Sequence, residues 1–154
     1  MTLNKKTKIN FINGIVSNKK KLKTLIYKVS KMGYFSIIKN VSFADKLPKG
    51  KEAESFFVRS YKIDDLVVTQ KVIKDVKFIK IDAEGAEIDI LNGSMNVLKS
   101  YHPTIFLSVH PKILSQKKQT TDELFNLLKD LNYKIFDKNN LETNKFSLDE
   151  YICK

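Results

Sequence analysis

Strand-like and helix-like patterns alternate along the second half of this chain, and that alternation restricts the possible folds more than any other feature of the sequence. Residues 76–81 and 104–109 are short apolar segments typical of strands. In residues 86–98 and 121–131 the apolar side chains instead recur at helical spacing. Strands that alternate with helices favour an α/β fold built on a parallel sheet, with helices on both of its faces.

The two predicted helices carry recognisable end signals. Thr120 and Glu123 form the capping-box pattern that starts a helix. Asn132 is suited to the position that ends the same helix. Pro103 blocks any extension of the helix predicted in residues 86–98.

The C-terminal segment is typical of an antiparallel hairpin. Residues 133–136 and 146–152 are apolar and aromatic enough to form two strands. Asn139 and Asn140 lie between them and predict a turn. The hairpin would close an otherwise parallel sheet.

The first half of the chain is less regular and predicts several strands. A polar stretch with proline and glycine at 47–54 predicts a loop. Asp64 and Asp65 suit the positive end of a short helix that begins near residue 63. Strand-like segments occur at residues 9–12, 22–29, 34–43 and 56–58. We expect one domain over residues 1–154, with a strand-rich, lysine-rich part at 1–60 and an α/β part at 61–154.

The basic residues are concentrated in the first half. The formal net charge is +11, and residues 1–80 hold 19 basic and 6 acidic side chains. Clustered cations favour nucleic-acid binding, but Arg59 is the one arginine, and arginine supplies the bidentate fork for phosphates and guanines. The lysine run at 19–23 therefore favours a solvated loop or strand edge. The alternative function is a non-enzymatic lysine-rich module that binds an anionic partner, such as nucleic acid, through residues 1–62.

The sequence also limits the compartment and the covalent chemistry. No apolar run reaches the roughly eighteen residues that a membrane span needs, and residues 1–18 lack the apolar core of a signal peptide. Cys153 is the one cysteine, so an intramolecular disulfide or a cysteine-based zinc site is excluded. We expect a cytoplasmic protein.

The most informative segment for chemistry is a strand that ends in a carboxylate and passes through a glycine turn into a helix. Asp82 directly follows residues 76–81, and ligands of open α/β sheets bind beyond the carboxyl ends of strands. Glu84 and Glu87 fall at or in the first helical turn, where the helix dipole stabilises negative charge. Lys80 lies inside the strand. In a sheet covered on both faces, its ammonium needs Asp82 or Glu84 as a partner.

These residues belong to a segment that resembles a known family signature. Lys80-Ile81-Asp82-Ala83-Glu84-Gly85-Ala86-Glu87 resembles the Lys-Ile-Asp-Val-Glu-Gly-Ala-Glu signature of FkbM-type methyltransferases. Residues 63–66 resemble the family's upstream Leu-Asp-Asp-Leu segment, and residues 103–110 resemble the strand after the signature. The resemblance covers residues 60–137 and, more loosely, residues 8–58, where 11–18 resemble the third strand and the loop that approaches adenine.

The resemblance implies methyl transfer from S-adenosylmethionine to a hydroxyl of a sugar or a natural product. It makes Asp82 and His110 the general base or the substrate-orienting pair, with Lys80 and Glu84 in support. Asn13 and Asp82 are the candidates for contact with the cofactor. Asp82, Glu84 and Glu87 could alternatively hold Mg²⁺, because carboxylates suit that ion, but we expect no metal.

Two departures from the family pattern affect the expected activity. Ser108 stands where the family has a glutamate two residues before the histidine, which removes a carboxylate from the expected pocket. The Asp-x-Gly-Ala-Asn-x-Gly turn of the first strand is absent, since the glycines stand at 14, 33, 50, 85 and 93. We therefore expect a partial Rossmann-like sheet, mostly parallel with an antiparallel C-terminal hairpin and without the first two strands of the family fold. Such a chain would be impaired or inactive, or would need a separately encoded N-terminal half.

Overall fold

The computed structural model describes residues 12–19, 21–29, 35–37, 53–69 and 75–154. The chain divides into two compact units. The first contains the described residues up to Ile15 and from Lys21 to Ser60, and the second contains residues 16–20 and 61–154.

The first unit is built on antiparallel strand pairs. Strand β2 (Lys21–Val29) pairs with β3 (Phe35–Ile37) on one side and with β4 (Ala53–Tyr61) on the other. With β1 (Ile15–Val16), the strand order of this sheet is β1-β4-β2-β3. The strands predicted at 22–29 and 56–58 are confirmed. The lysine run leads into β2.

Other predictions for this half are confirmed in part or fall outside the described residues. Of the strand predicted at 34–43, the structure describes residues 35–37, which form β3. Residues 9–11 of the strand predicted at 9–12 lie outside the described residues, and Ile12 lies in a non-regular segment before β1. Residues 47–52 of the predicted loop also lie outside the described residues, whereas its last two residues, 53 and 54, belong to β4.

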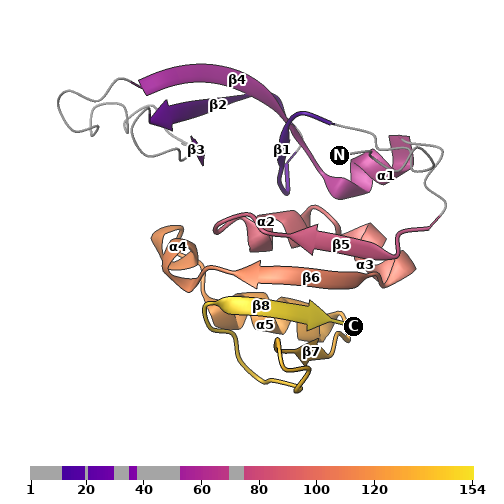
Figure 1. Cartoon of the computed structure of the whole chain (residues 1–154). Helices are drawn as coiled ribbons and strands as arrows, with labels where there is room; N and C mark the ends of the chain where they lie inside the picture. Colours follow the sequence, from indigo (N-terminus) through magenta and orange to yellow (C-terminus); the bar gives the residue numbers. More distant parts are fainter. Residues whose placement is uncertain (1–11, 20, 30–34, 38–52, 70–74) are drawn as a thin grey trace, which may run out of the picture. The chain divides into compact units, whose positions relative to one another are not determined.

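The second unit contains a mixed sheet with the order β5-β6-β8-β7 (Figure 1). Its strands are β5 (Phe78–Ile81), β6 (Thr104–Val109), β7 (Ile135–Phe136) and β8 (Asp149–Cys153). Strands β5 and β6 are parallel, and β8 is antiparallel to both β6 and β7. Three of the four strands therefore share one direction, as expected for a mostly parallel sheet with an antiparallel C-terminal hairpin. Asn140 takes a left-handed conformation in the predicted turn.

The single helix predicted over residues 86–98 is wrong, because the chain forms two helices there. They are α2 (Glu87–Asn92) and α3 (Met95–Tyr101), interrupted at Gly93 and Ser94. The Ser94 hydroxyl donates to the carbonyl of Ile90 at 2.6 Å, a contact that bends helices. The Asp64 carboxylate accepts from the N–H groups of Asn96 and Val97 at 3.1 and 2.9 Å, so it satisfies the free donors at the start of α3.

The remaining helices are α1 (Ile63–Thr69), α4 (Pro111–Gln116) and α5 (Thr121–Asp130). Helix α5 has the predicted capping box, with the Thr120 side chain accepting from the Glu123 N–H at 3.1 Å and the Glu123 carboxylate accepting from the Thr120 N–H at 2.9 Å. Asn132 follows its last turn in a left-handed conformation. Helix α4 was not predicted. It starts with Pro111 in its first turn, a position that proline favours.

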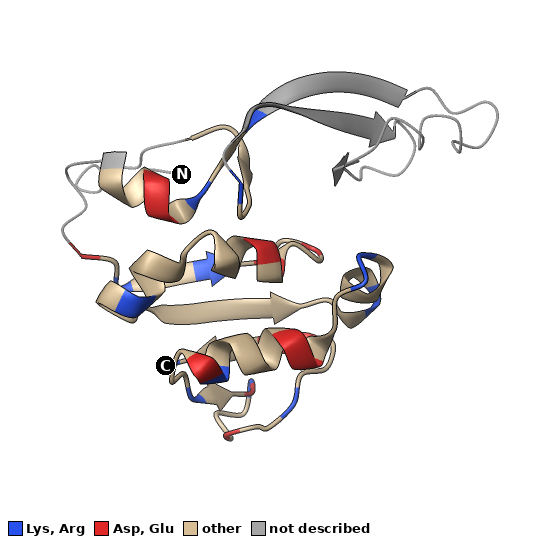
Figure 2. Ribbon diagram, turned by 180° about the vertical axis from the view of Figure 1, so that it is seen from behind, with Lys and Arg blue, Asp and Glu red and all other residues tan. Residues whose placement is uncertain are grey.

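Helices pack on one face of the second sheet, which Figures 1 and 2 show from opposite sides. The core residues at their interface are almost fully buried: Ile105, Leu107 and Val109 of β6, Leu91 of α2, Leu98 of α3, and Leu124 and Leu128 of α5. On the opposite face, Phe78 and Phe106 are 68% and 41% exposed. Within the described residues the sheet is therefore covered on one face, whereas we expected two. None of the helices in the described ranges has the length and apolar character needed to cross a membrane.

Candidate active site

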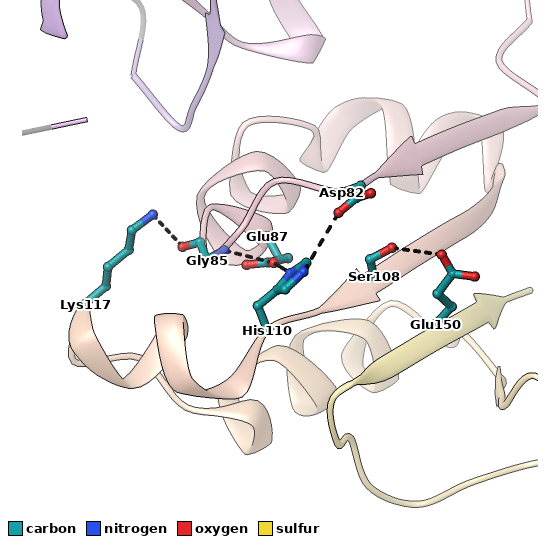
Figure 3. A network of polar contacts seen from close by, with 7 residues as sticks. All are labelled: Asp82, Gly85, Glu87, Ser108, His110, Lys117 and Glu150. Atoms are coloured by element: carbon teal, nitrogen blue, oxygen red, sulfur yellow. Dashed lines mark hydrogen bonds and ion pairs between the residues drawn. The ribbon is translucent and has the colours of Figure 1, made fainter. Parts of the chain in front are cut away.

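The carboxyl ends of β5 and β6 lie side by side because these strands are parallel neighbours, with Ile81 in register with Leu107. Asp82 follows β5, and His110 follows β6. The Asp82 side chain is half exposed, and its Oδ1 lies 3.9 Å from His110 Nε2 (Figure 3). The structure therefore brings together the two residues that the sequence placed first, at the edge where ligands of such sheets bind.

A third carboxylate supports the histidine from the opposite side. His110 Nδ1 lies 3.0 Å from Oε1 of Glu87, which is in the first turn of α2 and is fully buried. The same oxygen accepts a hydrogen bond from the Gly85 N–H at 3.0 Å. Sequence reasoning missed Glu87 as a partner of His110. The available signal is its spacing, because Ile90 and Leu91 lie three and four residues later on the buried side of the same helix.

The turn between β5 and α2 is held against α4. Gly85 has φ +86°, and a Cβ atom built on it would lie 2.6 Å from Ile113 Cγ2. The Lys117 ammonium donates to the Gly85 carbonyl at 2.7 Å. The glycine is therefore required both by its left-handed backbone and by the close approach of α4.

The two supporting residues predicted in the signature point to solvent. Glu84 is exposed and has φ +42°. Lys80 is also exposed, on the face of the sheet that the described helices leave open. The expectation that Lys80 is buried and paired is wrong, since that face carries no helix in the described part of the chain and its ammonium can stay hydrated.

A cavity of about 350 Å³ lies on the same open face, lined by residues of β5, β6 and β8 that include Lys80, Phe106, Ser108, Glu150 and Ile152. Ser108 is in register with Glu150, and its hydroxyl is 3.5 Å from the Glu150 carboxylate, a long contact. Ser108 replaces the carboxylate expected from β6, but Glu150 brings one to the same place from β8.

Two other expectations concern ligands. Asn13 is exposed in the segment before β1, in the first unit, so its predicted contact with adenine stays a prediction. Across the residues that the structure describes, no three histidine, cysteine, aspartate or glutamate side chains are placed to hold a metal ion. That includes the trio Asp82, Glu84 and Glu87.

Comparison with known proteins supports the signature. The methyltransferase FkbM domain family matches residues 2–135, which include the β5–α2 turn and the strand that leads to His110. No curated protein and no solved structure shows a significant match. Because the family match covers most of the chain, the chain belongs to the FkbM methyltransferase family.

Proposed function

We propose that this chain forms the acceptor side of an O-methyltransferase, in which Asp82 and His110 orient a hydroxyl of a sugar or a natural product and take up its proton. The observation that carries the proposal is the 3.9 Å separation of Asp82 Oδ1 and His110 Nε2 at the carboxyl ends of two parallel strands. An aspartate and a histidine in one open crevice are suited to orient a hydroxyl and to act as general base. Both are partly accessible, so a hydroxyl can reach them.

S-adenosylmethionine supplies the methyl group in this family, and we tested the described turn as a place to hold it. A glycine turn that holds a cofactor keeps its backbone open to the ligand. In the β5–α2 turn, the Gly85 N–H is bonded to Glu87, its carbonyl to Lys117, and the space beside its Cα is filled by Ile113. This turn does not fit the cofactor.

The proposal therefore includes weak binding of S-adenosylmethionine by residues 1–154 alone, and impaired or absent turnover. The other glycines of this chain are too far apart in sequence to form a second such turn. A separately encoded glycine-rich segment would complete the site. Calorimetry of S-adenosylmethionine with the purified chain tests this part, and a micromolar dissociation constant would show that the proposed impairment is wrong.

The acceptor role is testable without a methyl donor. In a chain labelled with ¹⁵N-histidine, we expect millimolar methyl glucoside to shift the ring signals of His110 and to leave those of His102 unchanged. Glucose with all hydroxyls methylated is the matched control ligand, because it cannot donate a proton. Asp82→Asn should weaken the response, whereas Asp130→Asn, which changes an exposed aspartate at the end of α5, should not. If no hydroxylated ligand in a panel of sugars and polyols shifts the His110 signals, the proposed acceptor site is wrong.

A further inference from the structure

Glu87 is an unusual residue for the buried face of a helix. It is fully buried, and its neighbours on that face of α2 are the apolar side chains of Ile90 and Leu91. A buried carboxylate is costly unless its oxygens are hydrogen-bonded. Oε1 has two partners, the Gly85 N–H and His110 Nδ1, whereas Oε2 has none within the part of the chain that the structure describes. The charge of this side chain is therefore directed at the turn and at His110.

The proton positions follow from the donors and acceptors at Oε1. A backbone N–H can only donate, and an ionised carboxylate can only accept. The 3.0 Å contact with Glu87 therefore needs a proton on His110 Nδ1. A neutral imidazole has one N–H, so Nε2 keeps its lone pair. Asp82 does not supply Nε2 with a competing hydrogen bond, because 3.9 Å is too long for one.

We propose that Glu87 is the positioning residue of this site: it fixes His110 in the Nδ1–H tautomer and leaves Nε2 as a proton acceptor beside Asp82. This inference rests on the proposed function for its purpose. When a hydroxyl binds, its O–H bond breaks and an N–H bond forms at Nε2. The imidazolium that results keeps its Nδ1–H bond to the Glu87 carboxylate, whose negative charge stabilises it. Glu87 acts through His110 and does not itself contact the acceptor.

The other histidine of the chain provides an internal reference. His102 Nε2 lies 3.2 Å from the carbonyl oxygen of Leu131, and a carbonyl can only accept. His102 must therefore carry its proton on Nε2. The sequence contains two histidines, and the structure assigns them opposite tautomers.

Long-range ¹H–¹⁵N correlation spectra of the full chain, labelled with ¹⁵N-histidine, distinguish the two tautomers. At a pH of about 8.5, where an ordinary imidazole is neutral, we expect a protonated Nδ1 in His110 and a protonated Nε2 in His102. His110→Asn assigns the signals by difference. A protonated Nε2 in His110 of the wild-type chain would overturn the inference without the need for any other variant.

Two glutamate variants test whether Glu87 is the cause. In Glu87→Gln the side-chain amide can donate to Nδ1, so we expect His110 to lose its preference for the Nδ1–H form while His102 keeps its own. Glu142→Gln, at an exposed position, should change neither histidine. An unchanged His110 tautomer in folded Glu87→Gln would also overturn the proposal. If that variant does not fold, the wild-type tautomer decides. No methyl donor or acceptor is present, so this outcome is independent of the test of the proposed function.

Discussion

Replacement of Gly85 by alanine should destabilise the second unit, and the structure separates two causes. The left-handed backbone, with φ +86°, costs an L-residue about 1–2 kcal/mol. The added Cβ would lie 2.6 Å from Ile113 Cγ2 and 3.2 Å from the Ile113 backbone carbonyl carbon, an overlap in the range of overpacked sites that cost about 1–3 kcal/mol. The expected loss of unfolding free energy is therefore roughly 2–5 kcal/mol.

A double-mutant cycle measures the two causes separately. Ile113→Ala removes the Cγ2 atom that meets the new methyl group, so Gly85→Ala in that background should cost little more than the backbone part, about 1–2 kcal/mol. Urea unfolding followed by circular dichroism gives the four free energies, provided that the slopes agree. If Gly85→Ala costs the same in both backgrounds, the close approach of α4 does not contribute. A cost below about 0.5 kcal/mol would refute the reasoning for both the backbone and the contact.

Three further predictions concern α5 and the C-terminal strands. Thr120→Ala should lower the unfolding free energy by about 1 kcal/mol, because the Glu123 N–H loses its acceptor, whereas Thr121→Ala, inside the helix, should change it little; urea midpoints decide, and equal losses would contradict the capping role. Burial raises the pKa of the Cys153 thiol to about 12, so iodoacetamide should modify it in urea but not in the native chain at about pH 8. Burial, and then the charge of Cys153, raise the pKa of Tyr133 from 10.0 to about 12. Both folded values exceed the unfolded ones, so stability should be complete below about pH 9 and should fall as the pH rises towards 12, with a smaller fall in Tyr133→Phe; a urea midpoint that is the same at about pH 8 and pH 11 would contradict this.

Local patterns were sufficient to predict the elements whose signals are local. Strand β6 and the capping box of α5 were predicted because β-branched side chains and capping residues act within a few positions of sequence. The interruption between α2 and α3 was not predicted, because one of its causes is distant in sequence. Asp64 of α1 caps the start of α3, about thirty residues later. Helix α4 is short, and Leu114, which is fully buried, gives it one strong core contact.

The candidate site was predicted as far as strand ends can predict it. Asp82 and His110 follow adjacent parallel strands, so the sheet rule places them in one crevice. The rule does not give the rotation of α2 about its axis, and that rotation turns Glu87 inward to His110. It also does not give the number of covered faces, which is why Lys80 was expected to be buried and is exposed.

Stability and the proposed chemistry depend on the same turn. The Gly85 carbonyl is bonded to Lys117 beyond the end of α4, and its N–H is bonded to the carboxylate oxygen that contacts His110. A displacement of this turn therefore moves Glu87 Oε1 relative to the imidazole before any acceptor is present. If Gly85→Ala leaves the chain folded at low urea, the His110 ring signals should change together with the measured loss of stability, and the His102 signals should not. This coupling is expected because the ring of His110 is held by the turn, whereas the ring of His102 stacks on Tyr133, with 4.2 Å between ring centres.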